Sequence, residues 1–409
     1  MRKSNGDKRP YLRPVTRIEL SEKNIKPRLI LLVVCLAIAA AALFTGVREL
    51  LKVEPGWQEI QISSKKPNCS SEFVLMYDFS DYGGTAAAAS RELTNVYTEA
   101  AEKAFLIFSP DVEDLAVQNL WQVNRHINEP VTVDPVLYEA FHQIRQAENR
   151  NLYLAPAYVE YNRIFLCENQ EEAAGYDPAF NEELRVYLAE LAAFASDPAH
   201  IDLELLGENR ICLKVSQEYL AFIQEYELET LVDFGWMKNA FIADYLAQRL
   251  TEKGYTSGYL TSFDGFTRNL DPRGNAYSIN FFHREGTQVS MPGRISYTGP
   301  MSIVSLRDFP LSDQDRWHYY TYGSGSIVHI TSVFLDPKDG LSKASVDALM
   351  GYSRDAGCAG LLLELIPVFI AETFNTTPLD SLADQGIYGV WYQDQQICST
   401  DPNLSLETP

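Results

Sequence analysis

Cysteine is scarce in this chain, with six residues in 409, and no two cysteines are separated by only two residues. A zinc cage built from closely spaced cysteine pairs is therefore not supported. No internal repeat with a period of about 20–50 residues is visible either. With 46% apolar and 12% aromatic residues, the chain can bury a sizeable core in one or two domains.

Positive charge is also scarce, except at the N-terminus. The chain carries 34 Lys and Arg against 55 Asp and Glu, a net charge of −21. Residues 1–28 hold nine basic and three acidic residues, a net +6, which leaves −27 for the remainder. A strongly acidic body argues against nucleic acid as a partner, because phosphate contacts need a basic face.

An uncharged run of 19 residues, LILLVVCLAIAAAALFTGV, extends from Leu29 to Val47 directly after the basic segment. As a helix it would reach roughly 28 Å, enough for a hydrocarbon core of about 30 Å. The basic flank predicts a cytoplasmic N-terminus and an extracytoplasmic body. A cleaved signal peptide is the main alternative, but its basic and apolar regions are usually shorter. A buried core helix fits poorly with the basic flank.

These observations predict an order of parts along the chain. We expect a basic cytoplasmic tail (1–28), a transmembrane helix (29–47), a stalk (48–71), a folded domain (72–398) and a flexible tail (399–409). Five cysteines lie outside the membrane in this scheme. They would form one or two disulfides with at least one thiol left over, or serve as small buried hydrophobic residues.

The folded region reads as a mixed α/β domain with much antiparallel pairing. Helical patterns cover 85–105, 135–149, 181–195 and 240–254, and the 135–149 helix has Asp134 as N-cap and Pro135 at its first position. Strand patterns are found at 73–79, 209–215, 228–234, 257–266, 277–283, 301–306, 316–322, 327–335 and 387–393.

The stretch VDFGWMKNAFIAD (232–244) joins one such strand, LETLVDF, to a helix through Gly235. A strand, a tight turn and a helix N-terminus form a common binding place for an anion such as phosphate. Yet the turn is not rich in glycine. Trp236 and Lys238 stand where a phosphate cradle would need small residues.

This stretch resembles a motif of the FAD:protein FMN transferase (ApbE) family. DFGWMKNAFIAD (233–244) aligns without a gap on the family pattern D-L-G-G-I-A-K-G-Y-A-V-D. SFDGF (262–266) is similar to the end of its N-L-G-G-D strand, and NLWQVNRHINEPVTVDPVLYEAF (119–141) to its asparagine-containing helix. SLRDF (305–309) is similar to S-G-D-Y, and HYYTYGSG (318–325) to H-I-I-D-P-R-T-G. The resemblance spans about 72–398.

The resemblance implies a two-lobed, T-fold-like body that binds FAD and Mg²⁺ and passes FMN to a threonine of a partner flavoprotein. It assigns cofactor binding to Asn124, Asp233, Gly235, Trp236, Lys238, Gly265 and Gly325. It assigns catalysis to His318. Asp347 lies in the neighbourhood of the family's metal motif, although not in its pattern, and is the candidate for a second catalytic residue and for the metal ligand. A cleft between 233–244 and 316–325 would follow, narrowed by Trp236, Tyr319, Tyr320 and Tyr322, whose rings suit stacking on a flavin or adenine.

The sequence departs from the family pattern where the chemistry is done. Trp236 replaces the second glycine, and Lys238 replaces the alanine whose carbonyl binds the metal. Near the expected A-D-A-L-x-T motif stands GLSKASVDALMG (340–351), which puts the metal aspartate on Leu341 or Lys343. Lys238 or Lys343 at the metal would oppose Mg²⁺ by charge. Lys238 could instead act as a fixed cation on a phosphate.

Three functions follow from these readings. The first is a membrane-anchored ApbE-like protein with weak or lost catalysis, which serves as a binding or scaffold module beside a membrane redox flavoprotein. The second is an active Mg²⁺-dependent transferase with a rearranged metal site at Asp347. The third is an anchored solute-binding or cell-surface module whose likeness to the family is accidental. For individual residues, simpler roles stay open: a helix cap for Asp233, a turn for Gly235 and packing for His318.

Overall fold

The structure is a computed structural model that describes residues 25–50, 56–114, 116–324 and 327–407. The chain divides into two compact units, Met1–Val53 and Glu54–Pro409. The first contains the helix α1 (Ile25–Leu50), whose segment Leu29–Gly46 is long and apolar enough to cross a membrane. The helix α1 is therefore compatible with a single-pass membrane anchor. A signal sequence meets the same criteria, so the helix alone does not fix the topology.

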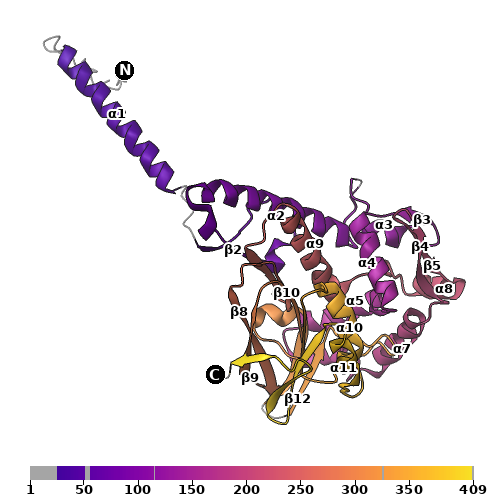
Figure 1. Ribbon diagram of the computed structural model, residues 1–409. Coiled ribbons are helices and arrows are strands. Elements are labelled where there is room, and N and C mark those ends of the chain that lie inside the picture. Colours follow the sequence, from indigo (N-terminus) through magenta and orange to yellow (C-terminus); the bar gives the residue numbers. More distant parts are fainter. Residues whose placement is uncertain (1–24, 51–55, 115, 325–326, 408–409) are drawn as a thin grey trace, which may run out of the picture. The chain divides into compact units, whose positions relative to one another are not determined.

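The second unit is built on an eight-stranded sheet in which every neighbouring pair of strands is antiparallel (Figure 1). In spatial order its strands are β1 (Trp57–Glu59), β2 (Phe73–Asp78), β6 (Gly258–Ser262), β7 (Phe266–Asn269), β10 (Met301–Arg307), β13 (Ala348–Ser353), β14 (Tyr388–Gln393) and β15 (Gln396–Ser399). The adjacent strands β2 and β6 are distant in sequence, because the chain between them forms a largely helical lobe.

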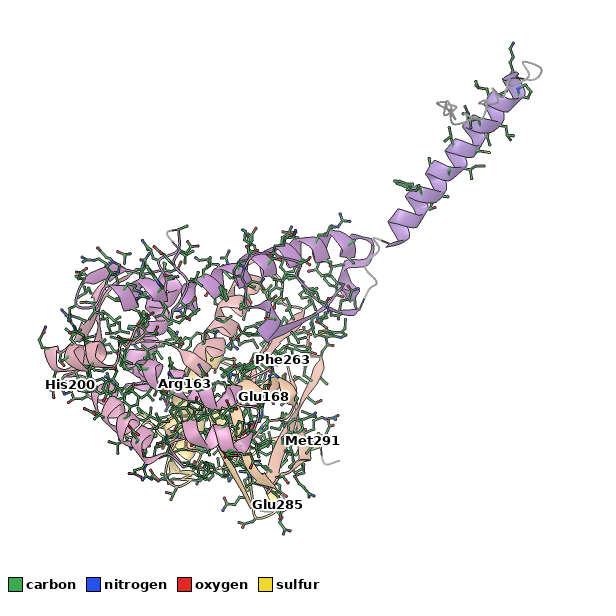
Figure 2. The ribbon with its side chains drawn as sticks, turned by 180° about the vertical axis from the view of Figure 1, so that it is seen from behind. Arg163, Glu168, His200, Phe263, Glu285 and Met291 are labelled. Atoms are coloured by element: carbon green, nitrogen blue, oxygen red, sulfur yellow. The ribbon has the colours of Figure 1, made fainter. Side chains whose placement is uncertain are left out.

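The sheet is covered on both faces. The helices α9 (Lys238–Glu252) and α10 (Cys358–Phe369) pack on one face, and α2 (Ala86–Phe108) packs against α9. A three-stranded sheet of β16 (Ser405–Glu407), β9 (Gln288–Thr298) and β8 (Ala276–Glu285) packs on the other. Glu285 and Met291, labelled in Figure 2, mark this β8–β9 hairpin. The core between the sheets includes Phe281, Ile303 and Val390.

The helical lobe contains a small sheet in the order β3 (Pro130–Thr132), β5 (Arg210–Val215) and β4 (Ile201–Gly207). Its helices are α3 (Leu120–Arg125), α4 (Pro135–Gln146), α5 (Ala155–Leu166), α6 (Gln170–Tyr176), α7 (Glu182–Ser196) and α8 (Gln217–Glu225). The other elements of the body are the hairpin β11 (Tyr319–Ser324)–β12 (Ile327–Ser332), the helix α11 (Thr377–Ala383), and the 3-10 turns η1 (Ser70–Glu72), η2 (Ser80–Thr85), η3 (Asn151–Leu154), η4 (Gly235–Met237) and η5 (Asp313–Trp317).

The predicted mixed α/β class is confirmed, and so are the elements with strong local signals. The helix α4 begins as expected, with Pro135 in its first turn and the Asp134 carboxylate accepting the Val136 N–H at 3.0 Å. α2, α7 and α9 lie within a few residues of their predicted bounds, and Gly254 follows α9 with a φ of +80°. Among the strands, β2, β5, β8, β10 and β14 were all expected.

Three strand predictions are wrong. Residues 228–234 pair with no strand, because a side chain and a loop carbonyl satisfy their backbone groups. The strand predicted at 257–266 is a hairpin, since the chain turns at Asp264 and Gly265 between β6 and β7. The start of the 316–322 strand is η5 instead, and β11 begins only at Tyr319.

Several elements were not anticipated. β13 and α10 occupy the region that was read as a metal motif and its sequel. Residues 405–407, expected to be loose, form β16 against β9, and residues 57–59 of the expected stalk form β1. All six cysteines are free thiols, and Cys69, Cys212 and Cys358 are buried, in line with the small-hydrophobe reading. The boundaries of the predicted parts otherwise stay predictions.

Candidate functional site

The turn that precedes α9 is shaped by Gly235. This residue has a φ of +52°, and a Cβ there would lie 3.1 Å from the Tyr158 ring. The η4 turn then directs Trp236 into the protein, where it is 7% exposed. Its Nε1 donates to the Tyr158 hydroxyl at 3.2 Å, and its ring meets Phe334 edge to face at 4.8 Å. The indole therefore has a fixed and buried position.

A cleft was predicted between this turn and the segment 316–325. The structure has only a small cavity of about 10 Å³ there. A space of that size holds about one water molecule. Its lining residues come from five segments of the chain: Trp236, Asp264, Phe266, Leu306, Arg307, His318, Tyr319, Val333 and Phe334. Tyr320 and Tyr322 were expected here, but they contact one another, and Tyr322 packs against Phe180. We call this space the closed cavity.

The polar groups around the closed cavity are not all satisfied. Asp264 Oδ1, Asn239 Oδ1 and Arg307 Nε find no hydrogen-bond partner among the described residues. Asn239 donates to Asp264 Oδ2 at 2.9 Å, and Arg307 pairs with Asp315 at 3.1 Å. Burial raises the pKa of Asp264, while the hydrogen bonds from Ser262 and Asn239 and the charge of His318 oppose that rise. These groups form a buried polar cluster beneath Trp236.

The structure brings His318 into the same cavity. The backbone carbonyl of His318 accepts the Val333 N–H at 3.1 Å, so these two residues face each other on adjacent strand ends. Asp233 lies just before the turn. Burial raises the pKa of its carboxyl, and the Gly235 N–H and the Lys238 charge partly offset that effect. Trp236 and His318 thus line one cavity, and Gly235 and Asp233 lie just before Trp236 in the chain.

Two other predicted cofactor residues point elsewhere. Asn124 is buried, its Oδ1 accepts the N–H groups of Leu231 (2.9 Å) and Val232 (3.0 Å), and its Nδ2 donates to the Val232 carbonyl at 2.9 Å. Its carboxamide thus replaces the strand partner that was expected for 228–234. Lys238 Nζ lies 3.7 Å from the Glu72 carboxylate and is about a third exposed. Gly325 lies outside the described residues.

Gly265 is required by the backbone of the sheet. Its φ is +108°, and a Cβ there would lie 2.4 Å from the Ser305 carbonyl oxygen. The turn between β6 and β7 approaches β10 closely at this point, where the Ser305 N–H donates to the Gly265 carbonyl at 2.9 Å. This glycine serves the turn whatever the site binds.

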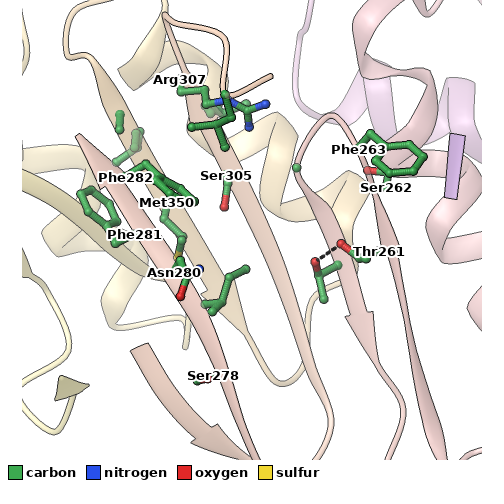
Figure 3. Close-up of a pocket in the computed structure, with 17 residues that line it drawn as sticks. Thr261, Ser262, Phe263, Ser278, Asn280, Phe281, Phe282, Ser305, Arg307 and Met350 are labelled. Carbon is green, nitrogen blue, oxygen red and sulfur yellow. Dashed lines mark hydrogen bonds between the residues drawn. The ribbon is translucent and has the colours of Figure 1, made fainter. Parts of the chain in front are cut away.

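Gly265 also borders an open pocket of about 360 Å³ on the opposite face of the sheet, between it and β8 (Figure 3). A pocket of this volume is within the range of small-molecule sites, about 300–1,000 Å³. Apolar walls come from Phe281, Phe282 and Met350, and polar groups from Ser278, Asn280 and Ser305. Figure 3 shows these side chains together with the hydrogen bond between Thr261 and Thr267 (2.8 Å). Trp236 and His318 do not line it.

Asp347, predicted to bind a metal, is engaged by protein groups. Its Oδ2 accepts from His283 Nδ1 at 2.5 Å and from the Arg284 backbone N–H at 2.9 Å. The neighbouring Asp308 forms a two-pronged ion pair with the Arg284 guanidinium. Asp347 therefore lies in a His–Arg network at the start of β13, and it does not line the closed cavity.

One group of carboxylates within the described residues is compact enough to share a cation. Asp336, Asp339 and Glu372 offer oxygens that all lie within 4.8 Å of one another, and we call them the carboxylate cage. The ammonium of Lys343 already contacts all three, at 3.0 Å from Asp336 and 2.7 Å from Asp339. Burial alone would lower the pKa of Lys343, but these contacts hold it well above its usual value.

The helix α10 offers no alternative metal site. It follows β13 as the first helix after the segment read as a metal motif, and its first two turns are CAGLLLE. Within them Glu364 is the one side chain with an oxygen, and it is exposed. At the start of α10 the Asp244 carboxylate accepts the N–H groups of Cys358 and Ala359, both at 2.9 Å. Because protein groups already engage Asp244, Asp347 and the carboxylate cage, the residues do not fit a bound Mg²⁺.

One signal in the sequence was overlooked. VFLDPKDG (333–340) matches the family pattern H-I-I-D-P-R-T-G at Asp336, Pro337 and Gly340, whereas HYYTYGSG (318–325) matches it only at the first and last positions. In this register Val333 stands at the histidine position. The pattern D-P-x-x-G would have found the segment from sequence alone.

The fold of this chain is similar to that of a solved ApbE protein. An ApbE protein from Thermotoga maritima superposes with a TM-score of 0.53 at 12% identity, covering 82% of this chain and 93% of that one. The flavin transferase ApbE of Vibrio cholerae gives 0.48 at 14% identity, with 80% and 92% covered. The apo flavinyl transferase ApbE of Pseudomonas stutzeri gives 0.48 at 14%, with 85% and 93% covered. No family model and no curated protein matches the sequence. At these identities the first superposition shows that the chain has an ApbE-like fold.

Proposed function

We propose that this protein is a membrane-anchored, extracytoplasmic ApbE-like module, related to FAD:protein FMN transferases, in which transferase activity is weak or lost. It would act as a binding or scaffold protein beside a membrane redox flavoprotein. The observation that carries this proposal is the closed cavity: the place expected for the cofactor has room for about one water, because Trp236 and Phe334 occupy it.

Three further observations support lost catalysis. Val333 stands opposite His318 at the position where the better-matching register has a histidine. The residues do not fit a divalent cation, and phosphoryl transfer depends on a cation to neutralise developing charge. Lys238, proposed as a fixed cation for a phosphate, is paired with Glu72 instead.

The alternative of an active transferase with a metal at Asp347 is less favoured. Such a metal would have to displace His283 and the Arg284 N–H from the carboxylate. It would also lie outside the cavity that holds His318 and Trp236.

The third function, solute binding, is favoured by a specific observation. The open pocket beside β8 combines three hydrophobic walls with the hydroxyls and the amide of Ser278, Ser305 and Asn280. A binding module of ApbE-like fold could use this pocket rather than the closed cavity. We therefore keep it as the second candidate.

The test is a flavin-transfer assay on the full-length protein in detergent. The chain is incubated with FAD, Mg²⁺ and an acceptor flavoprotein domain, and covalent FMN on the acceptor is measured by in-gel fluorescence and mass spectrometry. The Vibrio cholerae flavin transferase serves as positive control. We expect little or no labelling by this chain. Robust Mg²⁺-dependent labelling that Asp347→Ala abolishes would establish the second hypothesis in place of the first.

A further inference from the structure

The carboxylate cage differs from an ordinary surface cluster of acidic residues, because a cation already sits in it. Asp336 is 5% exposed and the Lys343 side chain 16%, whereas the side chains of Asp339 and Glu372 are 35% and 78% exposed. The third member, Glu372, comes from the loop after α10 and completes the contact with the ammonium. The charges in this place add up to −2: three carboxylates and one ammonium.

Backbone N–H groups hold two of the three carboxylates in place. Asp336 Oδ1 accepts the Lys338 N–H, and Asp339 Oδ1 accepts the Leu341 N–H, both at 3.0 Å. These bonds fold the 336–341 turn, while Oδ2 of each carboxylate remains for the ammonium. Calcium ions in proteins bind about 6–8 oxygens from carboxylates, carbonyls and waters. Two carboxylates on one tight turn and a third from a nearby loop would supply part of such a set.

The cage also stands next to the closed cavity. The Lys343 N–H donates to the Phe334 carbonyl at 2.9 Å, and the Phe334 ring packs against Trp236. A cation in the cage therefore fixes the strand end that carries one wall of that cavity. The chain supplies the positive charge in this cage from its own side chain.

We propose that the Lys343 ammonium takes the place of a divalent cation in the carboxylate cage, so that the 336–341 turn is held without metal. Removing the lysine charge leaves three carboxylates that repel one another unless a cation enters. The neutral variant becomes a calcium site, whereas Mg²⁺, which demands near-octahedral geometry, binds more weakly. This inference is independent of whether the protein binds flavin.

The experiment compares full-length wild type, Lys343→Met and Lys343→Arg in detergent after EDTA treatment. Lys338→Met is the matched control, because Lys338 is an exposed lysine on the same turn. Calcium chloride is titrated by calorimetry, and thermal midpoints are measured with and without it. We expect Lys343→Met to bind one Ca²⁺ with a dissociation constant of about 10⁻⁴–10⁻³ M and to gain thermal stability from it. The wild type, Lys343→Arg and Lys338→Met should show neither effect.

A second substitution assigns the site. Asp336→Asn in the Lys343→Met background should abolish calcium binding. If Lys343→Met folds only in the presence of calcium, its unfolding by EDTA is evidence that it binds calcium. Lys343→Gln repeats the test with a polar side chain. The inference is overturned if the wild type binds Ca²⁺ in a way that Asp336→Asn removes. It is equally overturned if Lys343→Met and Lys343→Gln bind none, or fold neither with nor without calcium.

Discussion

Replacing Trp236 by glycine should open the closed cavity. The indole is 7% exposed, donates to Tyr158 and packs on Phe334. Truncating a buried tryptophan costs about 3–5 kcal/mol, and the added glycine costs roughly 0.5–1 kcal/mol more in chain entropy. We therefore expect the free energy of unfolding to fall by about 4 kcal/mol or more. That is a large part of the roughly 5–15 kcal/mol available to a domain.

The hole left by the variant has the shape of an indole. A purine ring is of similar size, so we expect the variant, and not the wild type, to bind FAD through its adenine with Phe334 as an edge-to-face neighbour. Added indole should restore part of the lost stability, because a ligand that binds only the folded state stabilises it by mass action. Trp236→Phe is the control, since its ring keeps the cavity largely filled.

Urea unfolding measures the stability, and flavin fluorescence measures FAD binding. An unchanged unfolding midpoint in Trp236→Gly would show that the indole does not fill this space. Equal FAD binding by wild type and variant, insensitive also to His318→Ala, would show that flavin binds elsewhere. The open pocket beside β8 would then be the first place to examine.

Four further outcomes are expected. Asn124→Ala should lower the free energy of unfolding by about 3 kcal/mol or more in urea titrations. It leaves three buried backbone groups of residues 231 and 232 without a partner, at about 1–3 kcal/mol each. Asp347→Asn should cost about 1.5–3 kcal/mol yet leave any flavin transfer unchanged. Burial would raise the pKa of Asp271, but hydrogen bonds from Arg273 and Tyr277 outweigh it and hold the pKa well below its usual range. The carboxylate of Asp271 is therefore protonated at a lower pH in the folded protein than in the unfolded chain. The stability that it contributes above about pH 4 should fall as the pH drops further. Asp271→Asn should make this fall less steep in acid titrations. Protease added to intact cells should digest the body and spare residues 1–28.

Elements whose signal is local could be predicted from the sequence. Asp134 followed by Pro135 marks the start of α4, and Gly254 marks the end of α9. The helix α10 was missed because its sequence, CAGLLLELIPVF, is apolar on nearly all sides and has no amphipathic period. Segment 228–234 was misassigned because its backbone partner is the Asn124 side chain, more than a hundred residues away. No local pattern contains that contact.

The candidate site, like the fold, has some features that the sequence predicts and others that depend on contacts between distant residues. The resemblance predicted that the segments of Trp236 and His318 face each other, and both residues line the closed cavity. The family pattern nevertheless matches better at 333–340, whose residues Val333 and Phe334 line the same cavity. The role of Asp347 could not be predicted, because its partner His283 lies 64 residues away on another sheet. The Lys343 contacts depend on Glu372 beyond α10, and thus on the fold of a helix that the sequence did not indicate.

The retained and the substituted residues carry different information about function. Gly265 and Gly235 are needed by the backbone, because a Cβ at either position meets neighbouring atoms and φ is positive at both. Their presence would be required even in a protein that binds nothing, so they support the fold and not the activity. Trp236 and Lys343 are different, because the backbone does not require them. Trp236 packs on the Phe334 ring. The Lys343 ammonium contacts the carboxylate cage, and its backbone N–H donates to the Phe334 carbonyl. In our proposals, Trp236 stands in for a cofactor ring and Lys343 for a metal cation, so that the chain keeps its fold without either. Flavin transfer, FAD binding and calcium binding are therefore best measured on Trp236 and Lys343 variants, where the protein's internal substitutes are removed.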